Sequence, residues 1–455
     1  MTVDRSAALT ELIAALGPAV SLDPTELDAA RADKSGQRAA DAPLAIVHAR
    51  TADDVVAALR VATAHRLPVV PRGAGTGLAG GAMAGHDRLV VSTARMTRIL
   101  EIDAAEQLAV VEPGVIVAEL DAAAREQGLF YAPDPASRAW ASIGGTIATG
   151  AGGLMCVKYG VTREAVLALD VVLADGTRER FGHRTVKGVT GLDLTALMVG
   201  SEGTLGVIVG ATVRLTPVPR GETATIAAML PSVVAAAAAS SAIMASGLRP
   251  AALELIDPLA LAAIHQHLRL DAPAAGGTHL LVQCDGEQAG DDAKRALAII
   301  RAHGGDGRLT TDPANAEQLL TVRRSFHPAM EATGHVLIED VAVPRSRLAE
   351  MFAAIERISA DYGVPIPTVA HAGDGNLHPN FVYTGDTVPE AVWRAAHAVF
   401  RAALALGGTL TGEHGVGVLK KRHLVEELGE SQLALQRRIK AAFDPLGIMN
   451  PDAVL

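Results

Sequence analysis

The chain has 455 residues, 49% of them hydrophobic and 20% charged, and its formal net charge is −10 at pH 7. This length predicts two or more globular domains with sizeable cores, and the acidic balance argues against a nucleic-acid-binding surface. The two cysteines, Cys156 and Cys284, lie far apart in sequence and predict a reducing compartment without a disulfide framework.

The sequence also argues against export and against a membrane span. The first six residues lack the apolar core of a signal peptide. Residues 223–248 carry no charge, but Pro231 and several serines interrupt them, which favours a buried helix at 232–246. We therefore expect a cytoplasmic protein.

Short helices and strands are mixed in the N-terminal part of the chain. Hydrophobic periodicity predicts helices at 7–16, 24–33, 52–65 and 116–127, and strands at 44–47, 67–70, 88–92, 99–102 and 108–112. The regular strand–helix alternation of a doubly wound sheet is lacking, so we expect a less regular arrangement.

A glycine-rich stretch at residues 69–85 contains six glycines, no acidic residue and one cation, Arg72. Because glycine lets the backbone approach a ligand and turn successive N–H groups inward, the stretch predicts a phosphate or pyrophosphate site. Its G-A-G-T-G sequence at 73–77 resembles a dinucleotide-binding turn, but residues 78–88 lack the helical period that such a turn requires. On these residues alone, an ordinary glycine-rich surface loop remains the alternative.

Two more glycine-rich stretches follow, at 142–153 and 198–208, and together the three suggest one extended ligand. A domain boundary is predicted near residue 220, where prolines close the segment and the composition changes. Beyond it we predict strands at 224–229, 278–284, 335–343 and 366–370 and helices at 232–246, 257–268, 290–303 and 346–361. This order favours an α+β domain with helices on one face of an antiparallel sheet.

Two dense polar motifs, at 371–380 and 412–417, end this second domain. Two histidines seven residues apart, His371 and His378, and the acid Glu413 make a set that could hold a divalent metal with positions left open for water or substrate. The ordinary alternative is a set of surface or hydrogen-bonded core residues. We favour a functional site because polar residues among glycines form a poor core.

A third candidate is the segment 322–327, V-R-R-S-F-H. Arg323 could hold a carboxylate through its planar, two-pronged donor face. A solvated helix face is the equal alternative, and it is the interpretation we adopt for Arg324.

Seven stretches together resemble the flavin-dependent D-2-hydroxyacid dehydrogenases of the vanillyl-alcohol-oxidase-type FAD fold. They lie at 71–77, 133–135, 144–145, 200–206, 371–378, 412–415 and 445–451. The group includes cytochrome-type D-lactate dehydrogenase, D-2-hydroxyglutarate dehydrogenase and the glycolate oxidase flavin subunit. The resemblance implies an α+β protein in which an FAD-binding domain of the vanillyl-alcohol-oxidase/PCMH type carries an α+β, ferredoxin-like cap for substrate. The expected parts are an N-terminal helical segment (1–40), the FAD-binding domain (41–220), the cap (221–412) and a C-terminal segment returning to the FAD domain (413–455).

The resemblance also implies the site residues. FAD would be bound non-covalently, since residues 71–81 contain no histidine of the kind that tethers it in some relatives. The implied FAD contacts are Pro71, Arg72, Gly73, Ala74, Gly75, Thr76, Gly77, Leu78, Pro133, Asp134, Ser137, Gly144, Gly145, Thr149, Gly152, Gly153, Glu202, Gly206, Ile208 and Asn450. A divalent metal, zinc first with manganese and iron as alternatives, would be held by His371, His378 and Glu413. The implied catalytic residues are His414 as base, Arg323 on the substrate carboxylate and Asn380 as a nearby polar contact.

The expected reaction is oxidation of a D-2-hydroxyacid, with D-lactate to pyruvate as the first choice. A hydride would pass from Cα to N5 of FAD, a metal would lower the pKa of the hydroxyl, and a histidine would take its proton. Relatives that oxidise diacids tend to carry a lysine two residues before the aspartate that matches Asp340. Here Ile338 occupies that position, which favours a monocarboxylate unless His327 or His335 replaces the lysine.

Several alternatives stay open at this point. D-2-hydroxyglutarate or glycolate oxidation lies within the same class, whereas a non-catalytic flavin electron-relay subunit and a metallohydrolase lie outside it. The electron acceptor is a quinone, a cytochrome or electron-transfer flavoprotein. Peripheral association with the inner face of the membrane and a homodimer are compatible with the sequence.

Overall fold

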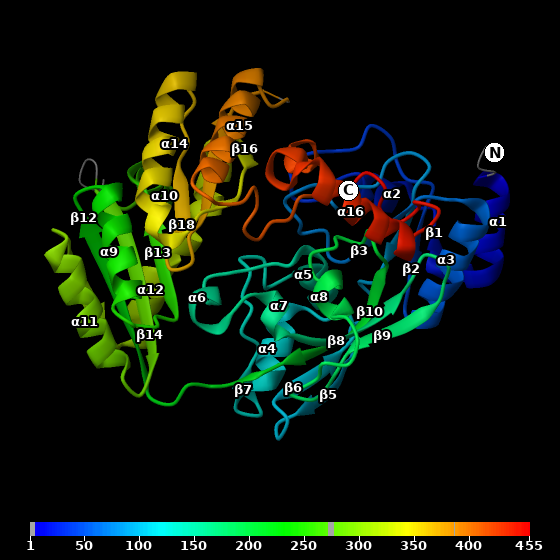
Figure 1. Ribbon diagram of the computed structural model, residues 1–455, viewed down its shortest axis with the longest axis horizontal. Helices are drawn as coiled ribbons and strands as arrows, with labels where there is room; N and C mark the ends of the chain where they lie inside the picture. Colours follow the sequence, from blue (N-terminus) through cyan, green and yellow to red (C-terminus); the bar gives the residue numbers. More distant parts are fainter. Residues whose placement is uncertain (1–4, 272–276, 386) are drawn as a thin grey trace. The chain divides into compact units, whose positions relative to one another are not determined.

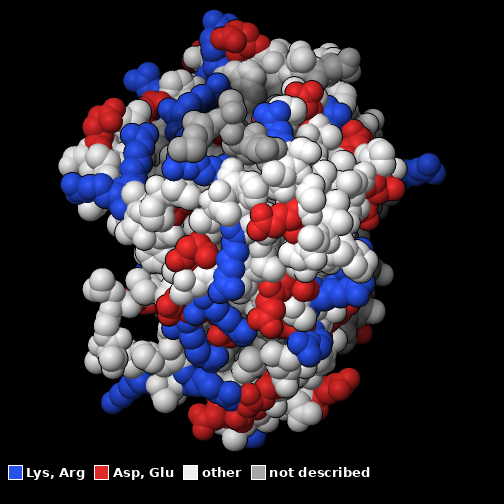
Figure 2. Space-filling view, turned by 90° about the vertical axis from the view of Figure 1, so that its right-hand side faces the viewer, with Lys and Arg blue, Asp and Glu red and all other residues white. Residues whose placement is uncertain are grey.

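A computed structural model describes residues 5–271, 277–385 and 387–455 (Figure 1). The chain divides into two compact units, and each is interrupted in sequence. The first comprises Met1–Gly152, Gly160–Val218 and His414–Leu455, and the second comprises Gly153–Tyr159 and Pro219–Glu413. Within the described ranges, no helix combines the length and the apolarity that a bilayer crossing needs. On the face drawn in Figure 2, lysines and arginines lie among aspartates and glutamates, as expected from 40 basic and 50 acidic residues.

A four-stranded sheet of order β1-β2-β4-β3 forms one part of the first unit. Its strands are β1 (Val20–Ser21), β2 (Ala45–His48), β3 (Val69–Arg72) and β4 (Leu89–Ser92). Strands β2 and β3 both run parallel to β4, and the first glycine-rich stretch connects β3 to β4. Residues of α1 (Arg5–Leu16) and α3 (Ala52–His65) share a buried apolar cluster with the sheet, and α2 (Pro24–Ala30) lies between α1 and β2 in the chain.

A five-stranded antiparallel sheet of order β5-β6-β10-β8-β9 forms the other part of the first unit. Its strands are β5 (Ile99–Asp103), β6 (Leu108–Val111), β8 (Val166–Val172), β9 (Arg178–Gly182) and β10 (Val207–Arg214). The accompanying elements are α4 (Val117–Arg125), β7 (Leu129–Phe130), α5 (Ile143–Thr149), α7 (Thr162–Ala165), α8 (Leu194–Met198) and β11 (Thr216–Pro217). The second glycine-rich stretch is thus partly helical, because the Ser142 side chain accepts a hydrogen bond from the Gly145 N–H and caps α5.

The C-terminal segment joins the first sheet beside β3. After α16 (Leu424–Phe443), the Val69 N–H donates to the carbonyl of Ile448, and the Asn450 N–H donates to the carbonyl of Val69. The last residues of the chain therefore extend the edge of the sheet that leads into the first glycine-rich stretch.

One antiparallel sheet dominates the second unit. The main path is β15-β12-β14-β13-β18-β19-β16, and β17 also pairs with β19. The strands are β12 (Glu222–Leu230), β13 (Ala252–Ile256), β14 (Thr278–Gly286), β15 (Asp306–Thr310), β16 (His335–Ile338), β17 (Val341–Ala342), β18 (Thr368–His371) and β19 (Asn376–Tyr383). The four predicted helices of this region are present, and so are the four predicted strands, although 335–343 is divided into β16 and β17. Three strands, β13, β15 and β19, and three helices of this region were not predicted.

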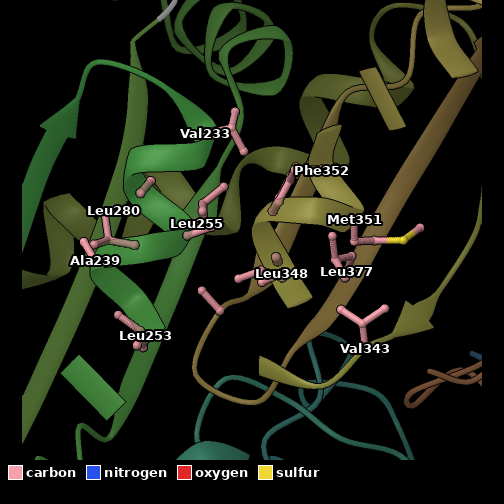
Figure 3. Packing of buried hydrophobic residues seen from close by; sticks show 14 of the residues in the cluster. Val233, Ala239, Leu253, Leu255, Leu280, Val343, Leu348, Met351, Phe352 and Leu377 are labelled. Carbon is pink, nitrogen blue, oxygen red and sulfur yellow. The ribbon is translucent and has the colours of Figure 1, made fainter. Parts of the chain in front are cut away.

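Helices cover both faces of this sheet, so the expectation of helices on one face only was wrong. The larger apolar cluster holds residues of α9 (Val233–Ala245), α11 (Ala289–Ala302), α14 (Leu348–Tyr362) and α15 (Glu390–Ala405). Figure 3 shows Leu253 and Leu255 of β13 and Phe352 of α14 in this cluster. A smaller cluster on the opposite face holds residues of α10 (Pro258–Leu268) and α13 (Phe326–Glu331), with Ile256 and Val369 from the strands.

The alternation along the strands determines which side chains share the second face. Leu253, Leu255, Ala370, Leu377 and Phe381 belong to the larger cluster, so their neighbours in each strand point the other way. Those neighbours include Glu254, His371, Asn376, His378 and Asn380. A polar patch therefore lies on the same sheet face as the smaller apolar cluster.

Candidate active site

The two predicted metal-binding histidines lie on neighbouring strands of the second unit. In the pairing of β18 with β19, His371 is opposite Asn376 and Val369 is opposite His378, so both histidines point to one face. Their rings are nearly perpendicular, with an interplanar angle of 84° and centroids 5.0 Å apart.

The third predicted ligand, Glu413, completes this set. Its Oε1 lies 3.2 Å from Nε2 of His371 and 3.1 Å from Nε2 of His378. Both histidines are buried, and the potential ligand atoms of the three residues all lie within 4.8 Å of one another. Two imidazole nitrogens and one carboxylate at this separation fit a divalent metal that keeps open positions.

Charge dominates the proton equilibria of this cluster. Burial by itself lowers the pKa of His371, but the negative charges of Glu254 and Glu413 outweigh it and hold that pKa well above the ordinary value. Burial raises the pKa of Glu413, but the positive charges and hydrogen bonds of His371 and His378 together outweigh it and hold that pKa well below the ordinary value. The pocket between these side chains therefore stabilises positive charge, and a bound cation would compete with a proton there.

Two carboxylates that were not predicted as site residues support this set, and both are fully buried. Glu254 accepts a hydrogen bond from Nδ1 of His371 at 2.7 Å. Asp340 accepts hydrogen bonds from the backbone N–H groups of Gly412 at 2.8 Å and Glu413 at 3.0 Å, and so fixes the loop that carries Glu413. It also accepts one from Nδ2 of Asn376 at 2.7 Å.

Arg323 and Asn380 lie in the same unit. Arg323, near the end of α12 (Pro313–Arg324), is buried, and its Nε donates to Oε2 of Glu254 at 2.7 Å. The neighbouring Arg324 is exposed and pairs with Glu317, which agrees with a solvated face. Asn380 is 1% exposed, and its Oδ1 has no hydrogen-bond partner among the described residues, so a buried acceptor is available on the site face.

His414, the predicted base, follows Glu413 directly and is the first residue of the last stretch of the first unit. Neither histidine suggested as a replacement for the missing lysine suits that role. His327 is about half exposed and pairs with Glu331. His335 stacks on Tyr383 and shares the strand face of Leu337, opposite to that of Ile338.

The first glycine-rich stretch, in the first unit, offers a row of backbone donors. Within the described part of the chain, none of the N–H groups of residues 73–79 donates a hydrogen bond to another residue. Arg72 contributes to the shape of this loop, because its guanidinium donates to the carbonyls of Ala82 at 2.6 Å and Ala32 at 2.9 Å. Successive unengaged N–H groups in a glycine-rich loop form an anion-binding concavity, which fits the diphosphate of FAD.

The remaining predicted FAD contacts are distributed over several parts of the chain. Pro133, Asp134 and Ser137 lie in the segment before α5, whereas Gly144, Gly145 and Thr149 lie in α5 and Gly152 just beyond it. Gly153 opens the short stretch assigned to the second unit, so the structure does not group it with the others. Ile208 packs in the apolar cluster of the five-stranded sheet, and Gly206 lies close to Val172, where a Cβ would come 2.9 Å from a carbonyl oxygen.

Asn450 and Glu202 connect the glycine-rich stretches to the C-terminal segment. Nδ2 of Asn450 donates to the carbonyls of Gly81 and Glu202, both at 2.8 Å. The Glu202 carboxylate accepts the N–H groups of Val416 at 2.7 Å and Gly417 at 2.9 Å. Burial nevertheless raises the pKa of Glu202 to about 7, because these hydrogen bonds only partly offset desolvation.

Comparison with known proteins bears on both units. The family described as "FAD binding domain" matches residues 43–182, and the family described as "FAD linked oxidases, C-terminal domain" matches residues 220–454. The chain is 39% identical to glycolate oxidase subunit GlcD of Bacillus subtilis, over 90% of this chain and 88% of that protein. It is 36% identical to D-lactate dehydrogenase of Archaeoglobus fulgidus, over 90% of this chain and 91% of that protein.

Among solved structures, that of p-cresol methylhydroxylase with substrate bound is similar to the whole chain. The TM-score is 0.81, with 18% sequence identity, over 100% of this chain and 97% of that one. At this identity the likeness concerns the fold alone, and it agrees with the expected α+β architecture.

Proposed function

This chain belongs to the FAD-linked D-2-hydroxyacid dehydrogenases of PCMH-type fold, and from that membership we propose that it oxidises D-lactate to pyruvate. It is an FAD-dependent hydroxyacid oxidoreductase, and the choice of substrate and the roles of individual residues are the proposal. The observation that supports it most is the cluster of His371, His378 and Glu413, in which His371 shares the Glu254 carboxylate with Arg323.

FAD, when bound, would supply the acceptor for a hydride from Cα of the substrate. The N–H groups of residues 73–79 supply donors for its diphosphate, which is why the loop between β3 and β4 contains glycine where side chains would intrude. Asn450 supports this role by fixing the carbonyls of Gly81 and Glu202, one from the first and one from the third glycine-rich stretch.

A divalent metal, with zinc as the first choice, would be held by His371, His378 and Glu413. When bound, it lowers the pKa of the substrate hydroxyl. Arg323 binds the substrate carboxylate through its two Nη groups, since its Nε is already engaged by Glu254. His414 accepts the hydroxyl proton on its imidazole, so the proton and the hydride leave the substrate to different acceptors.

The side chain of the substrate would face Ile338, at the position where diacid-oxidising relatives tend to carry lysine. Ile338 pairs with Asn380 across β16 and β19, and both point to the face that carries His378. Neither His327 nor His335 replaces the lysine of diacid-oxidising relatives, because His327 pairs with Glu331 and His335 stacks on Tyr383. A methyl group suits the isoleucine side chain better than a second carboxylate, which Ile338 could not pair with. Glycolate is the second candidate, since the relative in Bacillus subtilis is named a glycolate oxidase subunit.

The experiment is anaerobic mixing of the FAD-loaded protein with D-lactate, L-lactate, glycolate or D-2-hydroxyglutarate while the flavin absorbance is followed. We expect the fastest bleaching with D-lactate, loss of bleaching after chelation and recovery with zinc. Faster bleaching by glycolate would make glycolate the substrate. If no 2-hydroxyacid reduces bound FAD, the proposed reaction is wrong, whereas reduction that survives complete removal of metal would refute only the metal's role.

A further inference from the structure

Glu254 is a charged residue in the interior of the second unit that the reaction outlined above does not use directly. It lies at the centre of β13, whose sequence A-L-E-L-I is otherwise apolar, and it is 0% exposed. Leu253 and Leu255 on either side point into the larger apolar cluster, so Glu254 projects to the opposite face, which carries the polar patch. A buried carboxylate is costly unless charged or polar partners compensate it.

The two oxygens of Glu254 are divided between two different functional groups. Oε1 accepts the Nδ1 hydrogen of His371 at 2.7 Å, and Oε2 accepts the Nε hydrogen of Arg323 at 2.7 Å. His371 comes from β18, directly opposite Glu254 in the strand pairing, whereas Arg323 comes from α12. The carboxylate thus connects a proposed metal ligand to the proposed carboxylate-binding arginine through single hydrogen bonds.

Each contact restricts its partner in a way that matters for ligand binding. With the Nδ1 hydrogen held by Glu254, the His371 ring presents Nε2 toward Glu413 and keeps that nitrogen as the metal ligand. With Nε held by Glu254, Arg323 keeps its guanidinium plane fixed, and Nη1 and Nη2 are left as donors for a ligand. A change at His371 or at Arg323 therefore alters the hydrogen bond that Glu254 makes to the other residue.

We propose that Glu254 is a positioning residue that couples metal binding at His371 to carboxylate binding at Arg323. This inference rests on the metal and substrate roles proposed above and extends them, because it makes the two binding events interdependent through one side chain. By thermodynamic linkage, if a carboxylate bound at Arg323 changes the metal affinity by some factor, the bound metal changes the affinity for that carboxylate by the same factor.

A purely structural role for the contacts of Glu254 with His371 and Arg323 would lead to a different result. In that case Glu254 would only neutralise Arg323, and its loss would reduce stability without a specific effect on metal affinity. Asp257 offers a matched comparison, since it is also a buried carboxylate at the end of the same strand. Asp257 accepts the N–H groups of Ala260 at 2.7 Å and Thr368 at 2.8 Å and contacts neither His371 nor Arg323 by hydrogen bonds.

The test measures zinc affinity of the FAD-loaded, metal-stripped protein by competition with a coloured chelator. We expect Glu254→Gln to weaken zinc binding about 10- to 100-fold, as loss of a hydrogen-bond partner of a metal-bound histidine typically does. Asp257→Asn, which changes a buried carboxylate without a hydrogen bond to His371 or Arg323, should leave zinc affinity within about twofold of the parent. Glu254→Asp, which keeps the charge but shortens the reach, is measured in the same way and replaces the glutamine variant if that one does not fold.

Arg323→Lys supplies the test of coupling. It should change zinc affinity in the parent but have no effect when Glu254 is already glutamine or aspartate, because the connecting contact is then lost or weakened. Equal effects of Arg323→Lys in both backgrounds, or parent-like zinc affinity in the Glu254 variants, would overturn the inference. If the parent itself does not bind one zinc per chain, both the proposed metal site and the coupling are wrong. If the parent binds zinc but Arg323→Lys acts equally in both backgrounds, only the coupling is wrong.

Discussion

The turn between β18 and β19 sets the spacing of the two histidines, and Gly375 makes that turn possible. Its φ is +90°, and a Cβ at this position would lie 2.1 Å from the carbonyl oxygen of Val343. That oxygen is backbone, and the Val343 N–H in turn donates to the carbonyl of Gly375 at 3.0 Å, so neither side can move alone. We predict that Gly375→Ala both destabilises the second unit and weakens metal binding.

The size of the effect follows from two separate costs. A residue with a Cβ in the left-handed region costs about 1–2 kcal/mol. The contact with Val343 adds a further cost of about 1–3 kcal/mol, as is typical when an extra carbon is forced into a packed interior. Gly407 isolates the first cost, because its φ is +78° and no atom lies within 4 Å of a Cβ built there.

The assay compares Gly375→Ala with Gly407→Ala by urea unfolding and by zinc titration. We expect Gly407→Ala to lose only about 1–2 kcal/mol and to bind zinc like the parent. Gly375→Ala should lose more and bind zinc about tenfold or more weakly, which is about 1.4 kcal/mol, because His371 and His378 no longer converge. Equal destabilisation by the two substitutions, with zinc affinity unchanged in both, would show that the close approach to Val343 does not determine the site.

Three further predictions concern substrate and pH. Arg323→Lys should raise the KM for D-lactate about tenfold or more, since lysine lacks a planar fork, whereas Arg324→Lys at the exposed neighbour should leave steady-state kinetics unchanged; similar KM changes in both would argue against carboxylate binding at Arg323. Ile338→Lys should shift the ratio of kcat/KM values from D-lactate toward D-2-hydroxyglutarate, and an unchanged ratio would separate this position from specificity. Burial raises the pKa of Asp257 to about 7 from 3.8, so the folded chain binds this proton more tightly than the unfolded chain. The resulting stability is present below pH 3.8 and lost as the pH rises through 7, so the unfolding free energy should fall less steeply over this window in Asp257→Asn than in the parent. Equal slopes in urea unfolding at several pH values would contradict this assignment.

Local pattern was sufficient for much of the fold and for the clustering of His371, His378 and Glu413. The helix at 52–65 has the predicted bounds because Thr51 and Asp54 form a capping box that marks its start. The cluster of His371, His378 and Glu413 was predictable because glycines and polar residues are concentrated around those positions in the sequence.

Glu254 and Asp340 could not be identified in the same way. Strand β13 has five residues, and an acid interrupts its apolar run, so nothing local distinguishes it from a loop. This segment is a strand because it pairs with β14 and β18, which are distant in sequence. Asp340 lies between two short strands, and its role follows from the N–H groups of residues some seventy positions later.

The expectation of helices on a single sheet face failed for a related reason. The apolar stripe of α10 is as consistent with one face as with the other. Only the position of Ile256 and Val369, which point away from the larger cluster, determines that α10 and α13 cover the second face. The polar patch and the smaller apolar cluster then share that face.

The return of the C-terminal segment to the first unit has a consequence for biosynthesis. Val69 and Asn450 are joined by a backbone hydrogen bond, and the Asn450 side chain holds Gly81 and Glu202. During translation the second unit emerges complete before these contacts can form, so the nascent first unit waits with an open sheet edge next to the first glycine-rich stretch. A chain that ends before Asn450 lacks these hydrogen bonds, and its strand β3 keeps an unpaired edge where the first glycine-rich stretch begins.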